Sequence, residues 1–104
     1  MYLVVFRNRK RNDYDARSYA RDAEAMANLA AAQPGYLSFK SYVADDGEVV
    51  AISEWESREA ALAWGRHSDH AAMQARGRTQ YYADYTLFTC DAPRVVTFPK
   101  DEGA

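Results

Sequence analysis

Apolar and polar side chains alternate along residues 36–44 and 80–90, and this period of two predicts β-strands. Two further strands are predicted where residues 2–8 are mainly β-branched and aromatic and where residues 48–55 return from a hairpin turn. The predicted strands cover residues 2–8, 36–44, 48–55 and 80–90. These stretches are rich in the β-branched and aromatic residues that favour strands. The turn Asp45-Asp46-Gly47 joins the second and third strands as a hairpin. A continuation of the last strand through residues 94–98, interrupted at Pro93, fits the same pattern.

Asn8 interrupts the apolar face of the first strand. Tyr2, Val4 and Phe6 share that face, and Asn8 ends it with an amide. A polar side chain in such a place needs a hydrogen-bond partner, which the backbone or a ligand can supply. The sequence therefore marks Asn8 as a candidate site residue.

Helical spacing and an alanine-rich interior predict a first helix that begins at a cap, Asn12 or Asp13, and runs to about residue 32. Tyr19 belongs to a stripe along one face of this helix, which we assign to the core. The pair Pro34-Gly35 ends the helix.

Two shorter helices are predicted before the last strand. Ser57 caps the first of them, and Gly65 ends or bends it. Ser68 caps the second, which covers residues 69–76 and ends at Gly77.

The order strand, helix, strand, strand, helix pair, strand is that of the ferredoxin-like split β-α-β arrangement. The expected fold class is α+β, with one antiparallel sheet and helices packed on one of its faces. The other face is also partly apolar, and one small chain would expose it. We therefore expect a homodimer that buries sheet against sheet. The 104 residues suit a single domain, residues 1–98, followed by a flexible tail, residues 99–104.

The balance of charge argues against a nucleic-acid partner. The chain has 13 basic and 15 acidic residues and a net charge of −2, whereas nucleic-acid-binding domains carry a clear basic excess. The basic cluster of Arg7, Arg9, Lys10 and Arg11 is followed closely by acidic residues, so we interpret it as a solvated loop.

The single cysteine, Cys90, rules out an internal disulfide and a thiolate metal site within one chain. We expect Cys90 to be a small core residue on the last strand. A lone cysteine fits a reducing cytoplasm, and we expect a cytoplasmic location. No apolar run approaches the roughly 20 residues of a membrane span, and the N-terminus lacks the features of a signal peptide, so no membrane partner is expected.

Two histidines are candidates for acid–base chemistry. His67 and His70 are three positions apart, which places both on one face of a helix. A metal site would need a third ligand that nothing nearby supplies, so no metal is expected. An imidazole titrates near neutral pH and can serve as a base toward a phenol. We rank His70 above His67, because His70 lies inside the predicted helix on the side that should face the sheet.

Aromatic side chains are the other candidates. We give equal weight to two roles for Trp64, packing in the core and lining a pocket. Most strand tyrosines are structural, but Tyr82 and Tyr85 are candidates to line an aromatic pocket and to hydrogen-bond a planar ligand. Phe6 is a further lining candidate. Arg76 is a candidate to stabilise an anionic phenolate, although helix-end arginines are more often solvated.

Several motifs together carry a family resemblance. They are Pro34-Gly35-Tyr36, Asp46-Gly47, Ile52-Ser53-Glu54-Trp55-Glu56-Ser57, Glu59-Ala60, Ala63-Trp64, His70, Gln74, Gly77-Arg78 and Tyr82-Ala83-Asp84-Tyr85. Through them, roughly residues 1–90 resemble the antibiotic biosynthesis monooxygenase domain of the dimeric α+β barrel superfamily. The resemblance implies a pocket between the helices and the sheet of each subunit, and two such pockets in a dimer.

The family contains cofactor-independent oxygenases that oxidise polycyclic phenols, and members that bind haem and cleave its ring. The haem-cleaving members use an asparagine near the end of the first strand, a tryptophan on the later helix and a histidine that ligates iron. Asn8 and Trp64 match the first two by place, but the expected histidine position falls near Ala75. This departure argues against haem cleavage, since His67 and His70 lie earlier.

The resulting expectation is a cofactor-independent monooxygenase acting on a small phenol- or quinol-like aromatic compound, with no metal and no cofactor. Two alternatives stay open: a haem-binding or haem-degrading protein, and a non-catalytic domain that binds a small ligand. The expected catalytic residues are His70, Asn8 and Trp64, and the expected substrate-binding residues are Phe6, Tyr82, Tyr85, Arg76 and His67.

Overall fold

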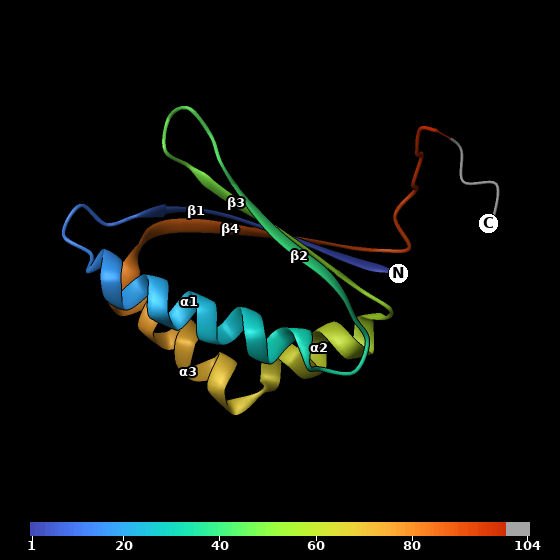
Figure 1. Cartoon of the computed structure of the whole chain (residues 1–104), viewed down its shortest axis with the longest axis horizontal. Coiled ribbons are helices and arrows are strands. Elements are labelled where there is room, and N and C mark those ends of the chain that lie inside the picture. Colours follow the sequence, from blue (N-terminus) through green and yellow to red (C-terminus); the bar gives the residue numbers. More distant parts are fainter. Residues whose placement is uncertain (100–104) are drawn as a thin grey trace.

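Four antiparallel strands form one sheet in the order β2-β3-β1-β4, and the α-helices lie on one of its faces (Figure 1). The computed structural model describes residues 1–99. Its elements are β1 (Tyr2–Lys10), α1 (Ala16–Ala31), β2 (Tyr36–Val43), β3 (Val49–Trp55), α2 (Arg58–Arg66), α3 (Ser68–Arg76), the π-helical turn η1 (Gly77–Tyr81) and β4 (Tyr82–Asp91). The predicted α+β, ferredoxin-like arrangement is confirmed.

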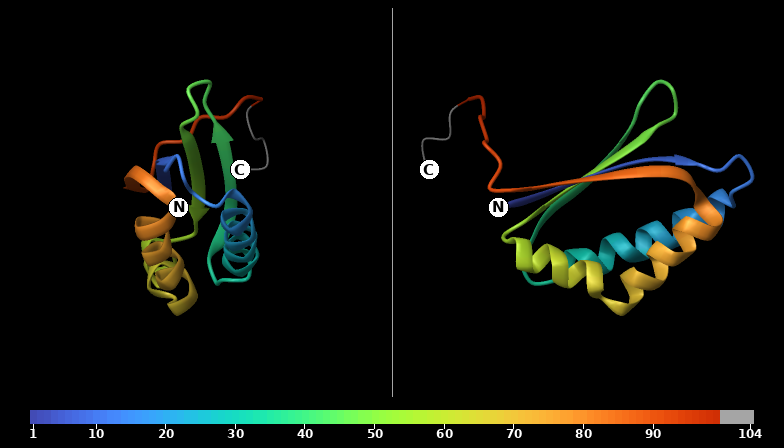
Figure 2. Two further views of the ribbon diagram at one scale, coloured as in Figure 1. Left: turned by 90° about the vertical axis from the view of Figure 1, so that its left-hand side faces the viewer. Right: turned by 180° about the vertical axis from the view of Figure 1, so that it is seen from behind.

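β1 is a central strand and pairs with β3 on one side and β4 on the other. Tyr2 lies opposite Trp55 in β3 and belongs with it and Ala30 to the buried core. Val4 packs against this core, so the even-numbered side chains of β1 face the helices. End-on, α1 forms one row and α2 with α3 forms a second row beside it (Figure 2). The core therefore lies at the N-terminal end of β1, under the C-terminal end of α1.

The helix starts correct two predictions about caps. α1 begins after Asp15, whose carboxylate accepts hydrogen bonds from the backbone of Arg17 and Ser18, and not after Asn12 or Asp13. α3 begins after His67, whose Nδ1 accepts from the backbone N–H of Asp69. Only the geometry shows which of several possible cap residues has the extended backbone that a cap requires.

The predicted cap at Ser57 is confirmed, since its hydroxyl accepts from the backbone N–H of Ala60. Gly65 was expected to end or bend α2, but the helix ends one residue later, at Arg66.

The α-helix α3 ends at Arg76 with Gly77 as its C-cap, as predicted, but Gly77 does not have the left-handed backbone of a typical glycine cap. The chain continues through it into η1, and its φ of −56° is ordinary for any residue. A Cβ atom built on Gly77 would lie 2.5 Å from Cε2 of Tyr82. This glycine therefore serves close packing: it lets the Tyr82 ring lie against the backbone at the start of β4.

The end of the chain also differs from prediction. β4 ends at Asp91, and residues 94–98 form no strand, so the expected continuation is wrong. The predicted tail, residues 99–104, lies outside the described residues except for Pro99. Within residues 1–99, no helix combines the length and the apolar character that crossing a membrane requires.

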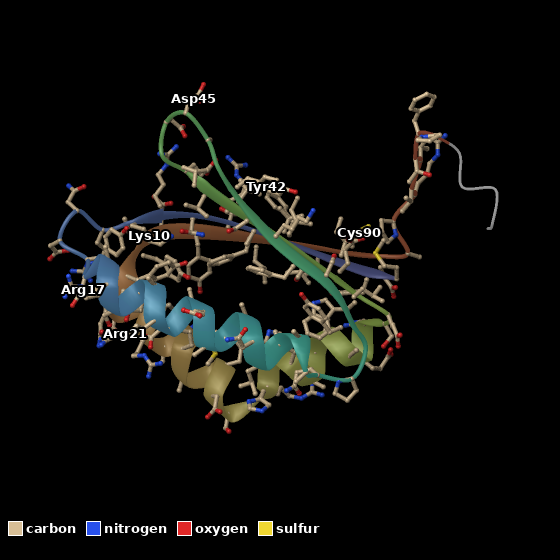
Figure 3. All side chains as sticks on the ribbon, viewed as in Figure 1. Lys10, Arg17, Arg21, Tyr42, Asp45 and Cys90 are labelled. Carbon is tan, nitrogen blue, oxygen red and sulfur yellow. The ribbon has the colours of Figure 1, made fainter. Side chains whose placement is uncertain are left out.

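The sheet face without helices carries apolar side chains, as predicted. Cross-strand register places Val5 beside Phe88 there, and Phe88 is 50% exposed. Tyr42 on β2 is 54% exposed on the same face. Cys90 also lies there, opposite Leu3, and is exposed (Figure 3), so its predicted place in the core is wrong. Among residues 1–99, no helix lies on this face, as Figure 2 shows.

Gly35, in the connection between α1 and β2, can be tested against Gly47, in the hairpin between β2 and β3, because both have a left-handed backbone. Gly35 and Gly47 have φ values of 85° and 89°, so alanine is strained at either position by about 1 kcal/mol. At Gly35 the new Cβ would also lie 2.5 Å from Cβ of Ala60, whereas nothing lies within 4 Å at Gly47. We expect Gly35→Ala to lower the free energy of unfolding by about 3 kcal/mol, and Gly47→Ala by about 1 kcal/mol. Urea unfolding measures both, and equal losses would contradict the packing of Gly35 on α2.

Candidate functional site

Three predicted site residues form an aromatic cluster on the helix side of the sheet. The ring of Phe6 lies 5.3 Å from that of Tyr82 and 5.2 Å from that of Tyr85, centroid to centroid, and the two tyrosine rings are 5.9 Å apart. An irregularity in the β1–β4 pairing between Arg9 and Lys10 makes this possible. Simple alternation placed Tyr82 and Tyr85 on opposite faces, but the irregularity turns both toward Phe6.

Asn8 lies next to this cluster, opposite Tyr85 in β4, and is only 2% exposed. Its Oδ1 accepts a hydrogen bond from the ammonium of Lys10. A lysine ammonium can only donate, so the carbonyl end of the amide must face Lys10. Within residues 1–99 the amide nitrogen of Asn8 makes no hydrogen bond, although the side chain is almost completely buried. Asn8 therefore keeps a free donor at the edge of an aromatic surface.

Lys10 is not part of a solvated loop, which corrects the prediction for the basic cluster. It is the last residue of β1, and its side chain extends toward the side of the sheet that α1 covers (Figure 3). Its Nζ lies 4.5 Å from the ring centroid of Tyr19 and 5.2 Å from that of Tyr82. Burial lowers the pKa of Lys10 below its usual 10.5. Arg7 and Arg9 instead reach acidic residues of the β2–β3 hairpin.

The tyrosines around Lys10 are held in their neutral form. Burial raises the pKa of Tyr82, and the adjacent Tyr19 adds to the effect. Burial also raises the pKa of Tyr19. Desolvation disfavours the charged phenolate in both cases. Their hydroxyls are therefore neutral hydrogen-bonding groups near pH 7 and supply no negative charge to balance Lys10.

Arg76 belongs to a polar network behind the aromatic cluster. Its Nε donates to Oδ2 of Asp22, 3.2 Å away, and the hydroxyl of Tyr81 donates to the same oxygen over 2.6 Å. The Tyr81 hydroxyl also lies 2.7 Å from that of Ser18. The hydrogen bond from the Tyr81 hydroxyl to the Asp22 carboxylate exists only while the hydroxyl keeps its proton, so it raises the pKa of Tyr81. Arg76 therefore joins α3 to α1, and no local pattern in the sequence indicates its carboxylate partner 54 positions away.

A second group of predicted residues surrounds Trp64. Its ring stacks on that of His70, with centroids 4.3 Å apart and planes 11° apart, and lies 6.4 Å from the ring of Trp55. His67 is 5.6 Å away. Nδ1 of His70 lies 3.0 Å from the carbonyl oxygen of Trp64, which can only accept, so Nδ1 carries the proton and Nε2 of the neutral ring is a free base.

Burial lowers the pKa of His70 below its usual value, against the opposing effect of the Trp64 carbonyl, and the charge of His67 lowers it slightly more. The ring is therefore neutral at pH 7. A neutral imidazole with an unprotonated Nε2 is the form that can take a proton from a substrate.

The structure separates these two groups. Trp64 packs with Trp55 and Tyr2, at the start of β1, while Asn8 lies six positions further along the strand. At a rise of about 3.3 Å per residue this is about 20 Å. A hollow of about 370 Å³ opens beside Trp64, lined also by Pro34, Glu56 and neighbouring residues of α2. The predicted residues other than Arg76 therefore fall into two clusters on one side of the sheet. The Asn8 cluster consists of Phe6, Asn8, Tyr82 and Tyr85 together with Lys10 and Tyr19, and the Trp64 cluster consists of Trp64, His67 and His70 together with Trp55.

The residues present do not fit an axially ligated haem. Ala75, where the resemblance places the iron ligand, offers no donor atom and is exposed. His70 lies five positions earlier, which is 140° around the helix and about 7.5 Å along it. Trp64 stacks on its ring and its Nδ1 is engaged by the Trp64 carbonyl, so only Nε2 could bind a metal, and it would do so away from the expected position. Among residues 1–99, no group of three His, Cys, Asp or Glu side chains is placed to hold a metal ion.

Comparison with known proteins agrees with this fold. Residues 1–76 match the family described as antibiotic biosynthesis monooxygenase. Because this match spans well over half of the chain, the protein belongs to the antibiotic biosynthesis monooxygenase family.

Its relatives include the uncharacterised protein YqjZ of Bacillus subtilis, which is 34% identical over 101 residues that make up 96% of this chain and 86% of YqjZ. Two solved structures share the fold. Rv0793 from Mycobacterium tuberculosis has a TM-score of 0.77 and 22% identity, over 92% of this chain and 98% of that one. SnoaB, a cofactor-independent oxygenase from Streptomyces nogalater, has a TM-score of 0.73 and 17% identity, over 95% and 97% of the two chains.

The lowered pKa of His70 predicts a specific pH dependence of stability. Below pH 6.5, where the unfolded imidazole begins to bind a proton, the folded ring resists protonation, so the unfolded state binds more protons. Stability should therefore rise with pH between the folded pKa and about pH 7. In urea unfolding at about pH 5 and pH 7.5, His70→Gln should show a smaller rise than the native protein. His67→Gln is the matched control. If the free energy of unfolding of His70→Gln rises between the two pH values as much as that of the native protein, the burial of this ring is contradicted.

Proposed function

We propose that this protein is a cofactor-independent monooxygenase that oxidises a small phenol- or quinol-like aromatic compound with molecular oxygen. The observation that carries the proposal is the free amide donor of Asn8 at the edge of an aromatic surface. Tyr85 and Leu87 share the helix side of β4 and are 42% and 54% exposed, so apolar surface beside Phe6 stays open to a planar ligand. Membership of the monooxygenase family supports the same reaction class.

The proposed reaction begins when a base removes a proton from the substrate, which has a phenolic or enolic oxygen. The carbanion passes an electron to oxygen, and the resulting radical pair combines to a peroxide on carbon. Loss of water then leaves a carbonyl group, so one oxygen atom enters the product and the other enters water. The protein contributes positioning, exclusion of water and stabilisation of the oxyanion.

Each candidate residue has a role in this scheme. The amide nitrogen of Asn8 donates to the substrate oxyanion, and rings of the Asn8 cluster hold the aromatic plane. His70, with its unprotonated Nε2, is the proposed base only for a substrate with several fused rings that extends from the Asn8 cluster toward Trp64, because one ring bound at Asn8 does not span the about 20 Å along β1 between the two clusters. Trp64 fixes His70 by stacking, and His67 lies against Trp64 at the far end. Arg76 acts indirectly, because its guanidinium pairs with Asp22.

Oxygen uptake with a panel of anthrone-type and quinol substrates tests the proposal. Asn8→Leu keeps the side-chain volume and removes the donor, so we expect kcat to fall about 100-fold. Asn28→Leu, on an exposed part of α1, is the matched control and should leave kcat unchanged. Circular dichroism checks that both variants fold. The absence of substrate-dependent uptake across the panel would refute the proposal and favour a non-catalytic domain that binds a small ligand.

We also infer that the protein works as a homodimer in which two helix-free sheet faces pack together. The exposed apolar side chains of Phe88 and Tyr42 on that face support this assembly. Burying such a face on a second copy would also shield Val5 and Ile52, which lie between these two residues in the sheet.

A charge on this face tests the assembly. We expect Phe88→Glu to convert the dimer to a monomer, because a carboxylate in the centre of an apolar interface is not compensated. Leu62→Glu is the control, since Leu62 is 41% exposed on α2, away from that face. Light scattering after size-exclusion chromatography gives the mass. A native protein with the mass of one chain, or a Phe88→Glu protein with the mass of two, would contradict the inference.

A further inference from the structure

Lys10 differs from the other cations of the described chain in its surroundings. Three basic side chains within residues 1–99 are half-buried: Arg9, Lys10 and Arg76. Arg9 pairs with Asp46 at 2.7 Å, and Arg76 pairs with Asp22 at 3.2 Å. Lys10 has no carboxylate within 4.0 Å among the described residues, and its one oxygen partner is the neutral amide of Asn8.

The remaining contacts of Lys10 favour its charged form without neutralising it. The faces of Tyr19 and Tyr82 attract the ammonium through their ring electrons, at 4.5 and 5.2 Å from the ring centroids. Both phenols stay neutral, because burial raises their pKa. One of the three N–H donors of the ammonium is used by Asn8, and the others have no oxygen acceptor within residues 1–99.

A partly desolvated cation without a counter-charge is costly, and an anionic ligand is what would offset that cost. The free donor of Asn8 lies on the same amide group that Lys10 holds. A ligand oxygen on the amide nitrogen and a negative group on the ammonium would therefore occupy neighbouring positions. One uncompensated positive charge matches one negative charge, so a carboxylate fits this place better than a phosphate dianion.

We propose that Lys10 is a specificity-determining residue, which binds a carboxylate carried by the aromatic substrate next to the oxygen that Asn8 binds. The inference rests on the proposed function in placing the substrate on the Asn8 cluster. It narrows the substrate class from phenols in general to aromatic acids with a neighbouring hydroxyl group. The rings of Tyr19 and Tyr82 hold the ammonium in place before the ligand arrives.

Binding of two probes with the same ring system tests this proposal. 1-Hydroxy-2-naphthoate carries the carboxylate, and 1-naphthol lacks it and is neutral near pH 7. Isothermal titration calorimetry of the native protein should show that the naphthoate binds at least about tenfold more tightly, the usual worth of a charge-assisted hydrogen bond. Equal affinities for the two probes, or no binding of the naphthoate, would overturn the proposal.

Two glutamine variants separate the charge from the packing. Lys10→Gln keeps a donor for Oδ1 of Asn8 but removes the charge, so the naphthoate should bind about tenfold more weakly and 1-naphthol within about twofold of the native protein. Arg58→Gln is the matched control, because Arg58 is exposed on α2, outside the Asn8 cluster and the helix-free face, and it should keep the native preference. Retention of the preference in Lys10→Gln would refute the role of Lys10.

A second change keeps the test decisive if Lys10→Gln does not fold. Lys10→Arg retains the positive charge and should keep most of the preference for the naphthoate, and its loss would count against a charge-based role. Because these titrations need no turnover, they are independent of the oxygen-uptake assay. A preference that depends on Lys10, combined with no oxygen uptake, would uphold the anion site and refute the monooxygenase.

Discussion

The candidate site depends on how β4 pairs with β1 across the irregularity between Arg9 and Lys10. A strand that followed strict alternation would turn either Tyr82 or Tyr85 away from the helices. The irregularity brings both rings to Phe6, and Gly77 leaves the room that the Tyr82 ring needs against the backbone. Moving this register would remove the aromatic surface and the support of Lys10 together.

The arrangement of the polar groups in the Asn8 cluster follows from the fact that an ammonium group donates hydrogen bonds and cannot accept them. Lys10 thereby fixes the orientation of the Asn8 amide and leaves its nitrogen as the group that can donate to another acceptor. The same contact leaves Lys10 without a counter-charge, in contrast to the paired Arg76. A positioned donor and an unbalanced cation side by side are suited to an anionic ligand, and less suited to a wholly neutral one.

Family membership and site chemistry constrain different parts of the function. The family supplies the reaction class, and the fold is shared with a cofactor-independent oxygenase. The distance between Asn8 and the Trp64 cluster, about 20 Å along β1, is a property of this chain that limits how substrate and base can meet. A substrate that reaches both clusters must be elongated, or the two clusters serve different steps. The Trp64–His70 stack is thus the part of the scheme most sensitive to the size of the substrate.

The sequence by itself determined the elements, their order and the α+β fold, because alternation, helical spacing and caps such as Ser57 act between near neighbours in the chain. It also marked Asn8, Trp64 and His70, since these residue types are unusual at their places. Tertiary structure decided which of them meet. Lys10 was assigned to a solvated loop because its partners, Tyr19 and Tyr82, come from α1 and β4. Their approach follows from strand register and helix packing, which no local pattern encodes, and a one-residue change of register reverses the face of a side chain.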